Sequence, residues 1–551
     1  MIGVLYTSRD EWIVREFFEL FKTPWEPYAC DVDYDAVLVS SGNIPRDSSA
    51  KVIIVYGSSI RDRDVQPVPR QTGADCIWLQ REDLELPIYS DVAALPPSDD
   101  CFLRSKVGGE SVGEVFQAQD RRIICIGYDL FDEVAILLTK GQPACNATSP
   151  TLELHISILR DCLISMGISF IEIPPAAYGF DFAASVTHDV DFVGIRDHKF
   201  DHTMWGFVYR ASIGALVSLA KGRSTWKRCI ENWKALASLP FVYLGICGDF
   251  WIEFDRYCEI ERGLNPTYFV IPFRDEPGTW GGRQAPPHRA AKYDVREIKD
   301  WVGKLAKEGC EIGLHGLNAW RDAESARKEK ARLSEVIDES QIGVRMHWLY
   351  SDEESSKALR DADLVYDSTC GYNDGIGFRA GTAQGFCPPS APGFLELPLV
   401  IQDTAMFYPN RMNLSEVEAM KRCDELIQSI SKYGGTLTVN WHTRSLSPER
   451  LWGEFYKELL KYIKQSRVWF CNCRTNAAWF RARRGVRFEA ASNEEAVRLT
   501  MDGPVPADLP PLRVRVYGNG KTDHLLPAHD PDIPWRGEAE LSVSLASNTR
   551  S

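Results

Sequence analysis

Residues 180–191 read Phe-Asp-Phe-Ala-Ala-Ser-Val-Thr-His-Asp-Val-Asp, a strand-like apolar run that ends in two carboxylates, Asp189 and Asp191. Side chains two positions apart on a strand point to the same face, so these two acids converge on one point while His188 turns away. Carboxylates at the mouth of a buried strand are costly unless they are paired, protonated or bound to a metal. The stretch therefore predicts a site where one carboxylate holds a metal and the other moves a proton.

The composition is that of a globular protein of two to four domains, with 551 residues, 44% of them hydrophobic and 25% charged. A formal net charge of -14 argues against nucleic acid or an anionic membrane surface as the main partner, although a local basic pocket remains compatible with it. The first residues lack the charged start and long apolar core of a signal peptide. No run of about 18 apolar residues predicts a membrane span. We therefore expect a cytoplasmic protein, in which most of the 15 cysteines are reduced core residues.

The pattern of strand-like and helix-like segments divides the chain into four parts. Residues 1–150 alternate short buried strands with helices, which predicts a small parallel α/β domain, flavodoxin-like or amidotransferase-like. Residues 151–179 form a linker helix and a boundary rich in proline. Residues 180–485 repeat β-α units, and residues 486–551 contain period-two alternation that predicts a small β-rich appendage.

Within residues 180–485, the predicted strands end in titratable side chains, at Asp189 and Asp191 and then at His315, His347, Asp367, Asp403 and His442. Chemistry gathered at the carboxyl ends of repeated β-α units is typical of a β/α barrel. A carboxylate together with neutral imidazoles suits a divalent ion such as zinc. A second carboxylate can take a proton from water, and a separate histidine can give one to a leaving amine. The pattern therefore favours a metal-dependent hydrolase.

Three motifs in this order resemble those of the polysaccharide deacetylase family, also called the carbohydrate esterase or chitooligosaccharide deacetylase homology domain. They are residues 187–191 (Thr-His-Asp-Val-Asp), residues 314–316 (Leu-His-Gly) and residues 439–443 (Val-Asn-Trp-His-Thr). The resemblance covers about residues 180 to 480, over half of the chain. It implies a distorted β/α barrel that removes N-acetyl groups from amino sugars with a divalent metal, expected to be Zn²⁺.

The resemblance also implies a role for each matching residue. Asp189 matches the catalytic base, Asp191 the metal carboxylate and His315 the first metal histidine. Arg345 matches the arginine that orients the base, and His442 matches the general acid.

Further roles are expected around these five residues. Asp403 is expected to orient His442, with Asp367 as the alternative. Arg379, Asn440 and Trp441 are expected to bind substrate.

One position departs from the family pattern. The family places a second histidine four residues after the first, and here that residue is Ala319. His347 is the predicted substitute, since it lies two residues from Arg345 and shares its face if the strand is regular. Asn318 is a weaker candidate. Other histidines near the site, His198, His202 and His288, are expected in loops.

The leading hypothesis is an enzyme that removes N-acetyl groups from an amino-sugar-containing glycan or its precursor, in polysaccharide, exopolysaccharide or glycoconjugate synthesis. Its substrate in the cytoplasm would be a soluble or lipid-linked precursor. Two alternatives stay open. One is a non-catalytic sugar-binding or scaffold protein that keeps the barrel. The other is a metal-dependent amidohydrolase that acts on a non-sugar amide, such as a cyclic imide or ureide.

Overall fold

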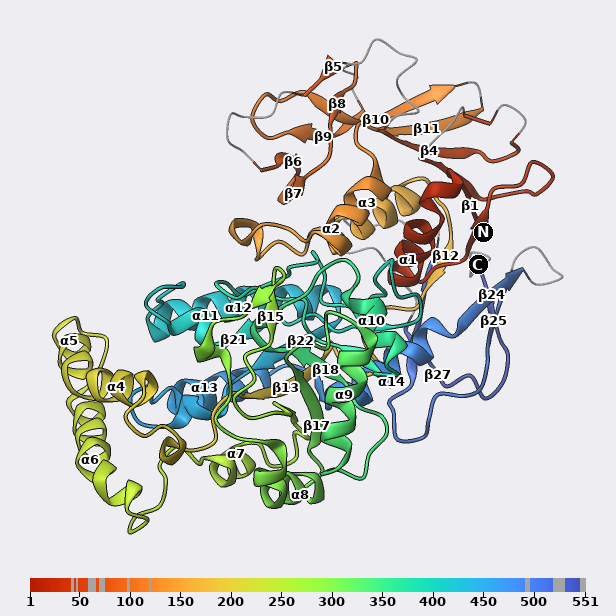
Figure 1. The fold of residues 1–551 in the computed structure, drawn as a ribbon. Helices are drawn as coiled ribbons and strands as arrows, with labels where there is room; N and C mark the ends of the chain where they lie inside the picture. The colour runs from red at the N-terminus through yellow and green to blue at the C-terminus, as the bar shows by residue number, and fades with distance from the viewer. Residues whose placement is uncertain are drawn as a thin grey trace.

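The computed structural model describes residues 1–40, 44–45, 48–57, 66–68, 75–96, 100–118, 120–490, 496–518 and 531–545. An N-terminal sheet with its helices stands on a parallel barrel-like domain, and a small β-rich unit near the C-terminus lies beside both (Figure 1). The α/β class and the added smaller units agree with the prediction from sequence. Among the described residues, no helix is long and apolar enough to cross a membrane.

The N-terminal sheet has nine strands in the order β2-β1-β3-β4-β11-β10-β9-β6-β7. Their bounds are β1 (Ile2–Leu5), β2 (Trp25–Pro27), β3 (Ala36–Val39), β4 (Val52–Tyr56), β6 (Ile77–Arg81), β7 (Leu84–Ile88), β9 (Cys101–Ser105), β10 (Ser111–Ala118) and β11 (Arg121–Ile126). Helices α1 (Glu11–Phe21), α2 (Leu130–Thr139) and α3 (Thr151–Ser165) lie between this sheet and the barrel (Figure 1). Two short strands, β5 (Gln66–Pro67) and β8 (Ala93–Ala94), pair separately.

This sheet is mixed, which corrects the prediction of a parallel layer. The pairs among β2, β1, β3, β4 and β11 are parallel, as expected. The remaining pairs, from β11 through β10, β9 and β6 to β7, are antiparallel. The turn between β6 and β7 consists of only Glu82 and Asp83, and so short a connection allows only an antiparallel hairpin.

The barrel sheet is parallel throughout and follows the order β20-β19-β18-β17-β14-β13-β22-β21, with β23 beside the start of β13. Its strands are β13 (Phe182–Val190), β14 (Thr267–Val270), β17 (Glu311–Gly316), β18 (Val344–Met346), β19 (Tyr366–Asp367), β20 (Leu395–Glu396), β21 (Ile401–Gln402), β22 (Thr436–Asn440) and β23 (Val468–Phe470). The sequence predicts one strand over residues 395–401, but the chain breaks there into β20 and β21, which pair with different neighbours. The sheet is interrupted at this point, so the barrel is distorted.

Successive side chains of β13 point to opposite faces, so the strand contributes both to the apolar core and to the interior of the barrel. Phe182, Ala184 and Val186 pack into the apolar cluster under helices α12 (Glu416–Tyr433) and α13 (Gly453–Ile463). Thr187 and Asp189 point the other way, toward Arg345 inside the barrel. The remaining barrel helices are α7 (Phe254–Ile260), α8 (Lys299–Lys307), α9 (Ala323–Ser334), α10 (Ser355–Asp361), α11 (Asp403–Phe407) and α14 (Cys473–Arg484).

A helical hairpin is inserted between β13 and β14 and projects from the barrel (Figure 1). Its first arm runs through α4 (His202–Tyr209), a π-helical turn at Arg210–Gly214, and α5 (Ala215–Ala220). Its second arm is α6 (Trp226–Tyr243). The two arms share a small apolar core that includes Phe207, Ala211 and Leu239. A small ribbon of β15 (Thr279–Trp280) and β16 (Arg283–Gln284) follows β14.

The β-rich appendage is present and extends into the predicted linker. Strand β12 (Phe170–Glu172) pairs with β26 (Leu512–Tyr517), which also pairs with β27 (Ile533–Trp535). A second sheet contains β24 (Val486–Ala490), β25 (Ala496–Met501) and β28 (Leu541–Ser544). Buried Arg483 of α14 donates hydrogen bonds to the carbonyl oxygens of Ile173, Glu19 and Leu20. The appendage, linker, barrel and N-terminal domain are therefore in direct contact.

Candidate active site and metal centre

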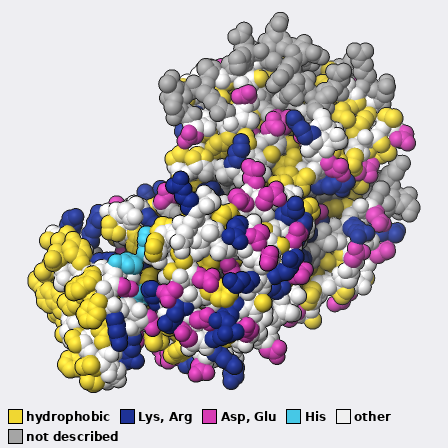
Figure 2. Space-filling model, viewed as in Figure 1, with side chains coloured by type: hydrophobic (Ala, Val, Ile, Leu, Met, Phe, Trp, Pro, Cys, Tyr) yellow, Lys and Arg dark blue, Asp and Glu magenta, His cyan; other side chains and the backbone are white. Residues whose placement is uncertain are grey.

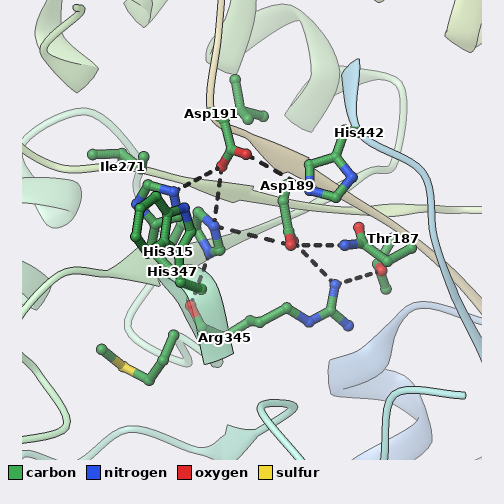
Figure 3. Close-up of polar contacts among 12 residues, drawn as sticks. Thr187, Asp189, Asp191, Ile271, His315, Arg345, His347 and His442 are labelled. Carbon is green, nitrogen blue, oxygen red and sulfur yellow. Dashed lines mark hydrogen bonds and ion pairs between the residues drawn. The ribbon is translucent and has the colours of Figure 1, made fainter. Parts of the chain in front are cut away.

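The titratable residues predicted from sequence gather at the carboxyl ends of the barrel strands (Figure 3). They come from β13 and its end (Asp189, Asp191), from β17 (His315), from β18 and the turn after it (Arg345, His347), from the start of α11 after β21 (Asp403) and from the turn after β22 (His442). Parallel strands deliver their carboxyl ends to one edge of the barrel, which brings together groups more than 250 residues apart in sequence.

Asp189 is a buried carboxylate held by two donors. Its Oδ1 accepts a hydrogen bond from Arg345 Nη1 at 3.1 Å, and its Oδ2 accepts one from Asn440 Nδ2 at 2.7 Å. Arg345 is itself fixed by Ser368 and by the Thr187 hydroxyl. Burial raises the pKa of Asp189, but the nearby charges of His315, Arg345 and His442 outweigh it and hold the pKa below its ordinary value. Asp189 is therefore an ionised, oriented carboxylate.

His188 faces away from this group, as the strand alternation predicts. Its Nδ1 donates to the carbonyl oxygen of Trp441 at 2.6 Å, and its Nε2 lies 3.0 Å from a Glu261 carboxylate oxygen. The side chain is fully buried on the outer side of β13. It belongs to the packing between the barrel and α7, not to the site.

Asp191, His315 and His347 form a compact set of metal-ligating groups. Asp191 Oδ1 lies 3.3 Å from His315 Nε2 and 3.5 Å from His347 Nε2. One ligand atom from each of the three residues lies within 4.8 Å of the other two. Burial raises the pKa of Asp191, but its interactions with the His347, His315 and His442 imidazoles outweigh burial and place the pKa far below its ordinary value. The carboxylate is therefore ionised.

The hydrogen bond of His315 Nδ1 determines which ring nitrogen carries the proton and which one presents a lone pair to Asp191. His315 Nδ1 lies 2.9 Å from the carbonyl oxygen of Arg345, which can only accept, so Nδ1 carries a proton. In the neutral ring, Nε2 then presents a lone pair toward the buried carboxylate oxygen of Asp191. That oxygen accepts no hydrogen bond from any described residue. Burial also lowers the pKa of His347 well below its ordinary value, which favours the neutral ring. One carboxylate and two neutral imidazoles around a common point fit a divalent cation such as zinc.

The missing second histidine is explained by the packing of Ala319. This residue is fully buried in the apolar cluster beneath β17 and β18 and points no ligand atom at the site. The Asn318 side chain is also directed elsewhere, since its Oδ1 accepts hydrogen bonds from Thr279. His347 brings the third possible ligand atom to the cluster from the turn that follows β18.

His347 leaves β18 through a strained turn. Trp348 and Leu349 both have positive φ, 62° and 53°, in a region that side chains other than glycine rarely adopt. Buried Arg289 donates to the carbonyl oxygen of His347 at 2.6 Å, and Asn373 donates to that of Trp348 at 2.9 Å. These bonds fix the turn that aims His347 at Asp191.

His442 lies across from Asp189 and is held by Asp403. Asp403 Oδ1 accepts from His442 Nδ1 at 2.6 Å, and Oδ2 accepts from the His442 backbone N–H at 2.8 Å. His442 Nε2 therefore faces the site, 3.6 Å from Asp191 Oδ2. Burial lowers the pKa of His442, but Asp403 outweighs it and raises the pKa above its ordinary value. Asp367, the alternative partner, instead accepts a hydrogen bond from Thr369.

These groups line a pocket of about 320 Å³. The hairpin contributes His202, Thr203 and Arg210 to its wall, and His288 lies on the opposite segment. His198 is not a loop residue open to solvent: it is buried and bonded to Asp201.

Three predicted substrate-binding residues have other positions. Asn440 binds Asp189 through its amide. Trp441 is fully buried and stacks on Tyr456 with ring centroids 4.8 Å apart, since it points to the opposite side of the chain from Asn440. Arg379 does not line the pocket; it packs against Tyr372 and Gly141 of the N-terminal domain.

Five arginines that the sequence did not single out line the pocket instead: Arg210, Arg289, Arg411, Arg444 and Arg450. Arg411 follows α11, and Arg450 follows the turn that holds His442. Arg450 Nη2 donates to the Tyr408 hydroxyl, and the Arg411 guanidinium lies 5.3 Å from the centre of the Tyr408 ring. Both arginines lie in loops, where no periodicity indicates which way a side chain points.

Three comparisons place the chain among known proteins. No protein-family model and no curated protein matches it. Among solved structures, the carbohydrate deacetylase Agd3 aligns over 99% of this chain and 98% of its own, with 9% identity and a TM-score of 0.38. The allantoinase Puue aligns over 55% of this chain and 92% of its own, with 12% identity and a TM-score of 0.34. The polysaccharide deacetylase Bc1974 from Bacillus cereus aligns over 41% of this chain and 86% of its own, with 14% identity and a TM-score of 0.23.

The structures found in this way include polysaccharide deacetylases, the family that the motifs resemble. The similarities are weak, so the case for the function of this chain rests on the geometry of its own site. Fold and site together define a distorted parallel β/α barrel whose pocket contains a carboxylate–imidazole cluster between an ionised aspartate and a histidine–aspartate pair.

The raised pKa of His442 depends on Asp403, and an Asp403→Asn substitution tests this. Without the carboxylate, burial is opposed only by the smaller effects of Asp191 and Asp189, so the His442 pKa is expected to fall from its raised value. NMR titration of the His442 ring in chelator-treated protein measures the change. Asp367→Asn serves as the matched control and is expected to leave the His442 pKa in place. An unchanged pKa in Asp403→Asn would contradict the assignment.

Proposed function

We propose that this chain is a metal-dependent hydrolase that removes N-acetyl groups from an amino-sugar-containing glycan or its precursor. One observation carries the proposal. Asp189, with a lowered pKa, and His442, with a raised pKa, flank the Asp191–His315–His347 cluster in a single pocket. A base and an acid whose pKa values are pushed apart on either side of a metal-ligating set suit amide hydrolysis.

The role proposed for each residue of the site follows from its contacts. A divalent ion held by Asp191, His315 and His347 would polarise the acetyl carbonyl and lower the pKa of water. Asp189 accepts the proton of the attacking water, and Arg345 and Asn440 keep its oxygens ionised and aligned. A carboxylate has lone pairs for further hydrogen bonds after accepting these two.

His442 supplies the second proton transfer. Its Nδ1–H is held by Asp403, so a protonated ring directs Nε2–H into the pocket, where the departing amine needs a proton. The choice of a sugar among possible amides rests on the motif resemblance. His347 offsets the absence of a histidine at position 319, which was the observation that favoured a non-catalytic protein.

Replacing Asp189 with Asn tests the enzyme and its base together. Loss of a general base is expected to lower acetate release from N-acetylated sugars by about 10²–10⁴-fold. Acetate release is measured over a panel of N-acetylated glycans, and ring opening of a cyclic ureide, the non-sugar alternative, is followed by mass spectrometry. The zinc content of the variant should be unchanged, because Asp189 is not one of the three ligands.

Asp374→Asn is the matched control, since this exposed carboxylate neighbours the pocket residue Asn373 but makes no contact with the cluster. It should retain full activity. Undiminished acetate release by Asp189→Asn would rule out its role as base. Turnover of the ureide alone would replace the sugar by a non-sugar substrate.

The charge of the pocket favours a substrate with an acidic group. Arg210 and Arg444 both pair with Glu449, so the two guanidinium groups share one carboxylate. Arg411 and Arg450 form no ion pair with a carboxylate among the described residues; their guanidinium groups contact the Thr404 and Ser445 hydroxyls and Tyr408. Burial lowers the pKa of Arg411, whereas Tyr408 and the nearby Glu449 and Asp403 carboxylates outweigh burial and raise the pKa of Arg450. A phosphate or carboxylate on the sugar would complete this pair.

The double variant Arg411→Gln/Arg450→Gln tests the acidic substituent. Hydrogen bonds to charged groups contribute about 1.5–3 kcal/mol each, so KM for an N-acetylhexosamine 1-phosphate is expected to rise at least about 10-fold, with little change for the neutral sugar. Arg210→Gln is the control, because this arginine lines the same pocket but is already paired with Glu449. Equal effects on the charged and the neutral substrate would contradict the assignment.

A further inference from the structure

Exposed apolar side chains are concentrated on the helical hairpin. Of the seventeen large hydrophobic residues that are exposed among the described residues, twelve lie within residues 200–246. Figure 2 shows these side chains gathered over the projecting end of the molecule that α4, α5 and α6 form. Apolar patches of this kind are uncommon on a monomer unless they contact something.

The exposure follows the helical repeat. On the first arm the exposed positions include Trp205, Tyr209, Ile213 and Leu216, spaced by four, four and three residues. On the second arm the exposed apolar positions include residues 226, 230, 233, 237, 241 and 244. The hairpin already buries a different face in its own core, around Phe207 and Leu239. Each arm therefore carries a second, solvent-facing apolar stripe that has no partner within the described part of the chain.

The charge of the hairpin is opposite to that of the whole chain. Residues 202–246 contain six Lys and Arg residues and a single acidic residue, Glu231, a formal charge of +5 in a chain of -14. Lys221 is exposed at the turn between the arms, and exposed Lys227 and Lys234 flank the stripe of α6 beside Trp226 and Trp233. Apolar stripes rich in tryptophan and tyrosine and bordered by lysine are typical of helices that lie in a lipid interface.

We propose that this hairpin, residues 200–246, docks on an anionic lipid membrane surface. Its basic residues would contact lipid headgroups, and its apolar stripes would enter the interface. Arg210 and Arg228 pair with Glu449 and Glu416 outside the hairpin, while Lys221, Arg223, Lys227 and Lys234 form no ion pair among the described residues. These four basic residues disfavour a second copy of this chain, because two faces of the same positive sign would meet. The overall charge, which argues against a membrane partner, therefore does not describe this surface.

The docking surface and the pocket share an element. The first arm carries the stripe on one side and contributes His202, Thr203 and Arg210 to the pocket wall on the other. The hairpin is tied to the barrel through Arg210 and through Asn232, whose Oδ1 accepts from the Glu449 backbone N–H. Docking would set the pocket beside the membrane surface without moving the barrel.

The test is flotation of the full-length protein with vesicles of phosphatidylcholine alone and with vesicles containing 30% phosphatidylglycerol. We expect binding to the anionic vesicles, weaker binding at high salt, and little binding to the neutral ones. Trp226→Ser/Ile230→Ser/Phe241→Ser and Lys221→Glu/Lys227→Glu/Lys234→Glu should each reduce binding at least about 10-fold, since each buried side chain and each basic residue contributes on the order of 1 kcal/mol or more.

Val107→Ser/Tyr178→Ser removes two exposed apolar side chains outside the hairpin and should bind like the wild type. Asp189→Asn should also bind normally, which separates docking from the proposed catalytic activity. Absence of vesicle binding, or equal binding by the hairpin variants, would overturn the proposal. So would light scattering that shows a dimer lost in the Trp226→Ser/Ile230→Ser/Phe241→Ser variant, because the face would then belong to a second copy.

Discussion

The site depends on balancing two carboxylates at the buried end of β13. Asp189 and Asp191 lie two residues apart at the carboxyl end of β13, and neither carboxylate could stay ionised there without nearby positive charge. The barrel surrounds the two carboxylates with different groups. Arg345 and Asn440 donate hydrogen bonds to Asp189 directly, while Asp191 lies beside the imidazoles of His315 and His347 and has one oxygen that accepts no hydrogen bond from any described residue. The first arrangement makes an oriented base, and the second makes a place for a cation.

Residues around the two carboxylates position the other groups of the site. Asp403 holds His442 so that its free nitrogen faces the pocket, and Arg289 holds the strained turn that aims His347. Arg411 and Arg450 add positive charge and form no ion pair with a carboxylate of the described residues. Together, the proposals describe an enzyme that takes an acidic N-acetylated sugar from an anionic membrane surface. A sugar carried on a lipid phosphate would combine both features.

Period-two alternation was the strongest guide from sequence to site. It placed Asp189 and Asp191 inward and His188 outward, as the structure has them. The same rule, applied to β22, places Trp441 in the core once Asn440 is seen to face Asp189. His347 was predicted as a ligand from its spacing to Arg345, although the strand ends at Met346.

Residues outside strands were harder to predict, because loops have no repeat that fixes a direction. Arg450 and Arg411 reach the pocket from such segments, whereas Arg379 is turned toward the N-terminal domain by a contact between distant parts of the chain. The antiparallel half of the N-terminal sheet was missed because its short hairpins resemble ordinary strand-turn runs. Strand β14 was missed because no titratable residue directly follows it, and titratable residues were the signal that marked the other barrel strands.

The central claim is that His347 replaces the missing second histidine. X-ray absorption of the zinc-loaded protein measures it most directly. The account predicts a shell with two imidazoles and carboxylate oxygen, one imidazole being lost in His347→Ala and both kept in His442→Ala. Zinc bound equally well by His347→Ala, with an unchanged shell, would contradict it.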